Sequence, residues 1–123
     1  MIKDLNTIQT TLQASLESHV PQLQIRVKSE TNFEAAGTKT VMQGKKKVDG
    51  HYFASVMPKA KDIRLYFFPI YTHVEHFELS PELQKFLKGK SCFHIKKLNE
   101  DLTQEIKAMI AKGVELYEND GLI

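Results

Sequence analysis

Residues 63–68 form the most apolar stretch predicted to be a β-strand, and they are apolar in both directions. Successive side chains of a strand point to opposite faces. One face of this strand is predicted to carry Ile63, Leu65 and Phe67, and the other Arg64, Tyr66 and Phe68. An antiparallel strand with one solvated face normally alternates apolar and polar residues. We therefore expect that both faces are covered, or that Tyr66 and Phe68 line a groove or a partner surface.

Two amphipathic helices are predicted on either side of the strand region. Apolar residues at helical spacing mark the first helix, which is expected to end near Ser18: Ile2, Leu5, Ile8, Leu12 and Leu16. A second apolar stripe marks a final helix that opens near Asn99: Leu102, Ile106, Met109 or Ile110, and Tyr117. Spacings of three and four residues place each set on one side of a helix.

Between these helices the sequence predicts about five strands, over residues 23–28, 38–42, 51–57, 63–68 and 92–96. Residues 29–37 are predicted to be a loop and residues 43–50 a lysine-bearing turn. Ser80 followed by Pro81 predicts the start of a short helix that ends near Gly89. This order predicts an α+β fold: a two-layer sandwich, with a twisted antiparallel sheet of about five strands carrying the N- and C-terminal helices on one face.

Composition agrees with one domain over residues 1–123. With 41% hydrophobic residues, a chain of this length buries about two-thirds of its surface on folding. No apolar run is long enough to cross a membrane, and the first twenty residues do not have the pattern of a signal peptide. The single cysteine, Cys92, excludes an intramolecular disulfide, so we expect a reducing, cytoplasmic location.

The net charge of +2 is small, but the charge is unevenly distributed. Residues 39–64 carry seven basic against two acidic side chains, and residues 85–97 carry five lysines and no acid. Only two residues of the chain are arginines, the side chain that most often reads bases through bidentate hydrogen bonds. We therefore do not expect nucleic-acid binding, and interpret Lys45, Lys46 and Lys47 as a solvated hairpin tip.

The segment SPELQKFLKGKSCFHIKK, residues 80–97, resembles the YdhG-like domain family. The segment YFASVMPKAKDIRLYFFPIYTH before it and the closing helix after it extend the likeness over residues 51–118. The order of short helix, Gly89-Lys90 pair, aromatic strand and C-terminal helix carries the resemblance. It implies a frataxin-like sandwich and, for some members, a proposed iron-chaperone role, without established catalytic residues.

Two clusters are candidate metal ligands. His73, Glu75 and His76 would place two imidazoles on one side if the segment is a helical turn, and on opposite sides if it is extended. Asp101 and Glu105 lie four apart on the last helix and could present two carboxylates to a cation. The alternative is that the first set is a solvated loop and that acids in a first helical turn interact with the helix dipole.

Cys92 and His94 share one face of a predicted strand, where such neighbours usually only pack, and we expect no catalytic residue. The leading hypothesis is a binding domain rather than an enzyme, with weak, open ligation of iron for delivery. The alternative is that Arg64, Tyr66 and Phe68 form a face for a small anionic ligand, a protein partner or a second copy of the chain, with no metal role.

Overall fold

The computed structural model describes residues 1–123. Its elements, in chain order, are α1 (Leu5–Glu17), β1 (Gln24–Lys28), β2 (Phe33–Ala36), β3 (Thr40–Gln43), β4 (Lys46–Asp49), β5 (Tyr52–Pro58), β6 (Ile63–Phe67), α2 (Pro69–Thr72), the 3-10 turn η1 (Val74–His76), α3 (Pro81–Phe86), β7 (Leu87–Lys88), β8 (Cys92–Ile95) and α4 (Glu100–Asn119).

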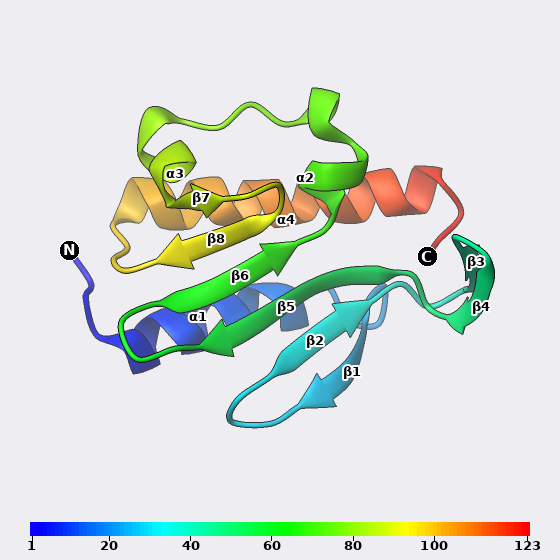
Figure 1. Ribbon diagram of the computed structural model, residues 1–123, viewed down its shortest axis with the longest axis horizontal. Coiled ribbons are helices and arrows are strands. Elements are labelled where there is room, and N and C mark those ends of the chain that lie inside the picture. Colours follow the sequence, from blue (N-terminus) through cyan, green and yellow to red (C-terminus); the bar gives the residue numbers. More distant parts are fainter.

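Six of the strands form one antiparallel sheet in the order β1-β2-β5-β6-β8-β7, and β3 pairs with β4 in a separate hairpin. Helices α1 and α4 contact each other, and α1 packs on the central strands β5 and β6. Figure 1 shows both long helices behind the sheet and no helix across its front. The predicted α+β sandwich, with the N- and C-terminal helices on one face, is confirmed.

Capping residues fix where the two long helices begin. Asp4 accepts a hydrogen bond from the backbone N–H of Thr7, and Asn99 accepts one from that of Leu102, which satisfies N–H groups that have no partner within the helix. The first helix therefore begins after Asp4, later than the apolar stripe suggested. Ile2 instead forms an isolated bridge with Leu98.

The core lies between the sheet and the two long helices. Leu65 and Phe67 of β6 and Phe93 of β8 are fully buried there, opposite Leu12 of α1. Gly113 lets α4 approach the sheet closely, because a Cβ atom there would lie 2.7 Å from Phe67 Cζ. The face predicted from Ile63, Leu65 and Phe67 is thus the one that the helices cover.

The predicted loop over residues 29–37 is wrong, since it contains strand β2. Phe33 and Ala35 are fully buried, and β2 lies between β1 and β5 in the sheet. The local sequence is small and polar, which is weak for a strand. Pairing on both edges and burial of Phe33 supply what local propensity lacks, so tertiary context decides.

The prediction for residues 38–50 is also corrected. The lysine turn is narrower than expected, because Lys46–Asp49 is itself a strand that pairs with Thr40–Gln43 outside the main sheet. Gly44 has a φ of +66°, a left-handed conformation that glycine adopts without strain. The lysines remain exposed on this hairpin, as the solvated-tip interpretation requires.

Two boundaries after residue 63 differ from the sequence-based expectation. Strand β6 ends at Phe67, and Phe68 has a helical φ of −64° and precedes Pro69 at the start of α2. The helix that opens at Ser80 ends at Phe86, and Leu87–Lys88 then pairs with β8 as an unexpected edge strand.

Candidate functional site

The sheet face opposite the helices, called the open face below, carries two rows of cross-strand neighbours. The antiparallel registers place one row across five strands: Glu34, Ser55, Tyr66, Cys92 and Lys88. A second row contains Met57, Arg64 and His94. Directly opposed residues of adjacent strands project to the same face at contact distance. Side chains distant in sequence therefore form one surface.

An irregularity in β5 moves an aromatic side chain onto this face. Ala54 pairs with Ala35 and Tyr52 with Ala36, so Phe53 is an extra residue on β5, the arrangement of a β-bulge. Phe53 packs edge-on against Phe67 in the core, and the Tyr52 hydroxyl donates to Ser55 Oγ at 2.7 Å. Side chains of residues 51–57 therefore do not alternate strictly between the two faces, because Phe53 faces the helices while Tyr52 and Ser55 share the open face.

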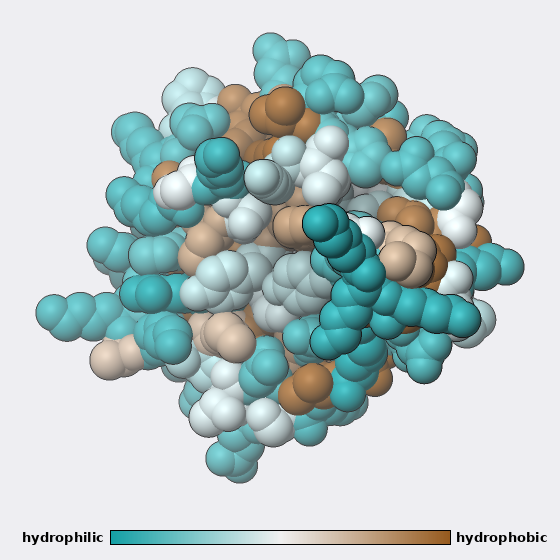
Figure 2. Space-filling model, turned by 45° about the vertical axis from the view of Figure 1, so that its right-hand side comes forward, coloured by the Kyte–Doolittle hydropathy of each residue, from teal (hydrophilic) through white to brown (hydrophobic).

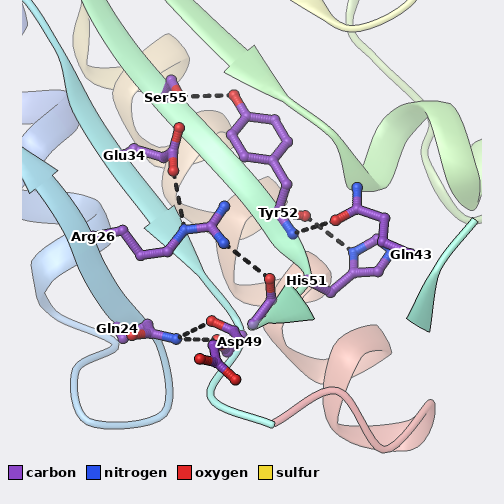
Figure 3. Close-up of polar contacts among 10 residues, drawn as sticks. Gln24, Arg26, Glu34, Gln43, Asp49, His51, Tyr52 and Ser55 are labelled. Carbon is purple, nitrogen blue, oxygen red and sulfur yellow. Dashed lines mark hydrogen bonds and ion pairs between the residues drawn. The ribbon is translucent and has the colours of Figure 1, made fainter. Parts of the chain in front are cut away.

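Arg26 lies on the β1 side of the open face, also at a shift in strand register. Its Nε donates to Glu34 at 2.9 Å and one terminal nitrogen to the Gly50 carbonyl at 3.0 Å. Figure 3 shows the guanidinium between Glu34 and the chain just before His51. Both side chains of the ion pair are about a quarter exposed, so the pair is fixed but accessible.

Arg64 on β6 is held by a second carboxylate. Its Nε donates to Asp62 at 3.3 Å, and His94 Nδ1 lies 3.8 Å from the other oxygen of the same carboxylate. Partial desolvation acts against the charge on Arg64, but the bond and charge of Asp62 and the Tyr66 hydroxyl raise its pKa overall. Asp62 is 6% exposed. A buried carboxylate thus orients a charged guanidinium whose terminal nitrogens are not used by that bond.

Cys92 lies beside Tyr66 in the first row. Burial raises the pKa of the Cys92 thiol, although the nearby Tyr66 and Arg64 act in the opposite direction. A raised pKa disfavours the thiolate, which is the nucleophilic form. Cys92 therefore lies on the open face as a partly buried thiol next to Tyr66.

Aromatic rings continue from the open face to the end of β6. The Phe68 ring centroid lies 5.7 Å from that of Tyr52 and 5.7 Å from that of Tyr71, and the Lys90 ammonium sits 5.3 Å from the centre of the Tyr71 ring. Figure 2 shows pale and apolar atoms in the middle of this side of the molecule, surrounded by hydrophilic side chains. Phe68 is half-buried and shares the aromatic surface as predicted, although it lies beyond the strand.

The first predicted metal cluster forms a 3-10 turn. Both ring nitrogens of His73 have a hydrogen-bond partner. Thr72 Oγ1 lies 2.7 Å from Nδ1, and Asp120 Oδ2 lies 2.7 Å from Nε2. The rings of His73 and His76 have centroids 6.2 Å apart, and His76 Nε2 lies 3.7 Å from Glu75. The turn therefore brings the two histidines to the same side and adds Asp120 from the end of α4, which the sequence did not predict.

In the second predicted metal pair, Glu105 already has partners. Its two carboxylate oxygens accept from the backbone N–H of Ser80 at 2.8 Å and from the Ser80 hydroxyl at 2.6 Å. Asp101 is exposed one turn earlier on α4. Glu105 thus ties the start of α3 to α4. The structure contains no group of three or more His, Cys, Asp or Glu side chains placed to hold a metal ion.

Several residues of the open face were not predicted from the sequence, namely Arg26, Glu34, Tyr52, Ser55 and Asp62. For Arg26 the sequence did contain one signal, namely that only two of the 17 basic residues are arginines. The sheet brings both arginines to the same face. The two arginines are 38 residues apart in the sequence, and no helix or strand periodicity over that distance predicts that they share a face.

No protein-family model, curated protein or solved structure matches the chain. The resemblance to the YdhG-like family therefore stays a prediction. None of the helices combines the length and the apolar character needed to cross a membrane.

Proposed function

We propose that this protein is a non-enzymatic binding domain that holds a small organic anion on its open face. The observation that carries the proposal is the position of Arg26 and Arg64. Both arginines lie on the sheet face without helices, and each is oriented through Nε by a carboxylate. Guanidinium groups with fixed orientation bind carboxylate and phosphate groups with defined geometry.

The surface between the arginines supports the apolar part of such a ligand. Tyr66 and Tyr52 are half-buried on it, and the Ser55 hydroxyl is already bonded to Tyr52. Rings of this kind offer flat apolar area beside a polar group. A few fixed charges around an apolar surface are the usual composition of a small-molecule site.

The test is a titration of the 15N-labelled protein with benzoate and with phenyl phosphate, followed through backbone amide shifts. We expect saturable shifts centred on β5, β6 and β8. Arg64→Gln should weaken binding at least tenfold, because a hydrogen bond to a charged group contributes about 1.5–3 kcal/mol. Lys61→Gln, which removes an exposed charge next to the strand, is the matched control and should leave affinity within twofold.

Neutral benzyl alcohol separates charge recognition from simple apolar contact and should bind more weakly than benzoate. If benzoate and phenyl phosphate give no saturable shifts, or if Arg64→Gln changes nothing, the proposal is wrong. Sedimentation at two protein concentrations tests the alternative that a second copy of the chain occupies this face. A salt-insensitive dimer that buries β5 and β6 would assign the face to a second copy of the chain.

We keep metal delivery as a second proposal, because Asp120 lies 2.7 Å from His73 and the His76 ring is nearby, although these side chains are not arranged around one ion position in the structure. The resemblance to the YdhG-like family supports iron as the cargo, bound weakly and released to a partner. An anaerobic ferrous titration should broaden amides near residues 73–76 and 120 in the wild type and not in a variant with both histidines changed to alanine. Sharp spectra throughout at millimolar iron would refute it.

A cytoplasmic location is part of the proposal, and the single free cysteine supports it. Cys92 is partly buried beside Tyr66, and a reducing compartment keeps it as a thiol. The test is the oxidation state of Cys92 in cells, measured by alkylation before lysis. Full alkylation is expected, and a mixed disulfide on most molecules would contradict a reducing location.

A further inference from the structure

A groove lies between α2 and the β7–β8 hairpin, next to the open face. Its volume is about 540 Å³ and its lining is mostly apolar: Ile70, Tyr71, Val74, Leu87, Gly89 and Lys90. We call it the α2–β7 groove. Tyr71 is 47% and Val74 64% exposed, so two of the most exposed large apolar side chains of the protein belong to one hollow.

The groove is continuous with the open face. Phe68 contacts Tyr52 on that face and Tyr71 in the groove, with ring centroids 5.7 Å apart in both pairs. Along β6, Arg64 and Phe67 are separated by about 10 Å at the rise of a β-strand. The path from Arg64 over Tyr66 and Phe68 to the groove therefore begins at a fixed cation and ends at an apolar hollow.

Basic side chains lie at both ends of this path, but only Arg64 is held in place by a buried carboxylate. Its Nε donates to Asp62 at 3.3 Å. At the groove, the Lys90 ammonium rests on the Tyr71 ring, and its methylene stem can cover an apolar chain while the charge stays in water. The groove lining contains no acidic side chain, so the apolar part of a ligand meets no carboxylate there.

We infer that the anion bound by this protein is amphipathic, with its charged group at Arg64 and a linear hydrocarbon chain that runs over Tyr66 and Phe68 into the α2–β7 groove. This inference rests on the proposed function of the open face and adds the class of ligand, a chain-bearing carboxylate or phosphate. Burial of each methylene in the groove tightens binding by up to about fourfold.

The test compares carboxylates of one head group and increasing chain length: butanoate, decanoate and hexadecanoate, each below its micelle concentration. Affinity is measured by amide shift titration of the labelled wild-type protein. We expect hexadecanoate to bind at least tenfold more tightly than butanoate, with chain-dependent shifts at residues 70–74 and 87–90. Equal affinities for the three would overturn the inference while leaving the anion site intact.

Variants locate the two ends of the ligand. Val74→Glu places a charge in the groove at an exposed position and should weaken hexadecanoate about tenfold while butanoate is unchanged. Met42→Glu, at a similarly exposed apolar residue (59%) on the β3–β4 hairpin, is the matched control and should change neither. Unaltered hexadecanoate binding by Val74→Glu would place the chain elsewhere and refute the inference.

Arg64→Gln should weaken both butanoate and hexadecanoate by a similar factor, because it removes the partner of the common head group. Lys90→Gln should weaken neither by more than about twofold. If Lys90→Gln removes butanoate binding and Arg64→Gln does not, the head group lies at the groove and the inferred orientation is wrong. If none of the carboxylates binds, the inference and the proposed anion site fail together.

Discussion

The two faces of the sheet are made from the same strands but have opposite chemistry. On the helix side, alternate residues such as Leu65, Phe67 and Phe93 are fully buried. On the open side, Arg64 and His94 are half-buried beside the Asp62 carboxylate, and Tyr66 is half-buried next to Cys92. A strand with apolar residues on both faces can therefore pack in the core through one face. Its other face can carry a polar and aromatic surface.

The largest effect is expected on the covered face. Phe53→Ala removes a fully buried ring that contacts Phe67 and Tyr117, so we expect a loss of about 3–5 kcal/mol in the free energy of unfolding. Urea denaturation measures it. Met42→Ala on the exposed hairpin is the control and should change stability by less than about 0.5 kcal/mol. A Phe53→Ala loss as small as the control's would contradict the assignment of Phe53 to the core side.

A smaller effect tests the carboxylate that ties α3 to α4. Glu105→Ala leaves the backbone N–H and the hydroxyl of Ser80 without partners, and we expect a loss of about 1–2 kcal/mol. Asp101→Ala, one turn earlier and exposed, should lose less than about 0.5 kcal/mol. Comparable losses in urea denaturation would show that Glu105 has no special structural role, and would return it to consideration as a metal ligand.

Alkaline pH distinguishes the environment of Tyr52 from that of a solvated tyrosine. Burial raises the pKa of Tyr52 to about 12, with the Ser55 hydroxyl partly opposing the shift. Because the folded pKa lies above the unfolded value of about 10, this contribution to stability is complete below pH 10 and is lost as pH rises toward 12. Unfolding measured across this range should show a shallower loss in Tyr52→Phe than in the wild type.

Tyr117 contributes to the same pH range from the covered face. Burial and the neighbouring Tyr52 raise the pKa of Tyr117, so the Tyr52→Phe protein still loses some stability above pH 10. The comparison is therefore between slopes. Identical slopes in wild type and Tyr52→Phe would contradict the buried hydroxyl pair of Tyr52 and Ser55.

The smallest effect is expected at the edge of the open face. Lys90→Gln removes an ammonium from the Tyr71 ring, and such contacts at exposed sites contribute about 0.5–1 kcal/mol. We expect a loss of no more than this in urea denaturation. A loss above about 2 kcal/mol would mean that the β7–β8 hairpin depends on this contact, and Lys90 variants would then be unsuitable for locating a ligand.

Periodic segments of the sequence predicted the fold well. The helical spacing of Leu12 and Leu16, and of Ile106 and Ile110, gave both long helices, because burial of one side of a helix demands that spacing. The β2 strand was missed since its stability comes from neighbours on both sides rather than from its own residues. The bulge at Phe53 was missed for a related reason, because a break in alternation depends on pairing with β2.

The candidate site was predictable only in part. Arg64, Tyr66 and Phe68 were identified from one strand, and the structure places them on an accessible aromatic surface. Their partners come from other strands, such as Glu34 on β2 and His94 on β8, or from a turn in the case of Asp62. No local pattern links residues so far apart.

The sequence by itself determined the helices and strands whose apolar residues recur at regular spacing, and it determined that one strand has a second apolar face. Only the tertiary structure decided what that second face carries. Strand order, register and two bulges place both arginines, their carboxylates and the tyrosines on one face of the sheet, and each of these depends on contacts between segments distant in the chain. The spacing of apolar residues in a segment reflects which side of that segment is buried, whereas a site that spans several strands depends on how those strands pair.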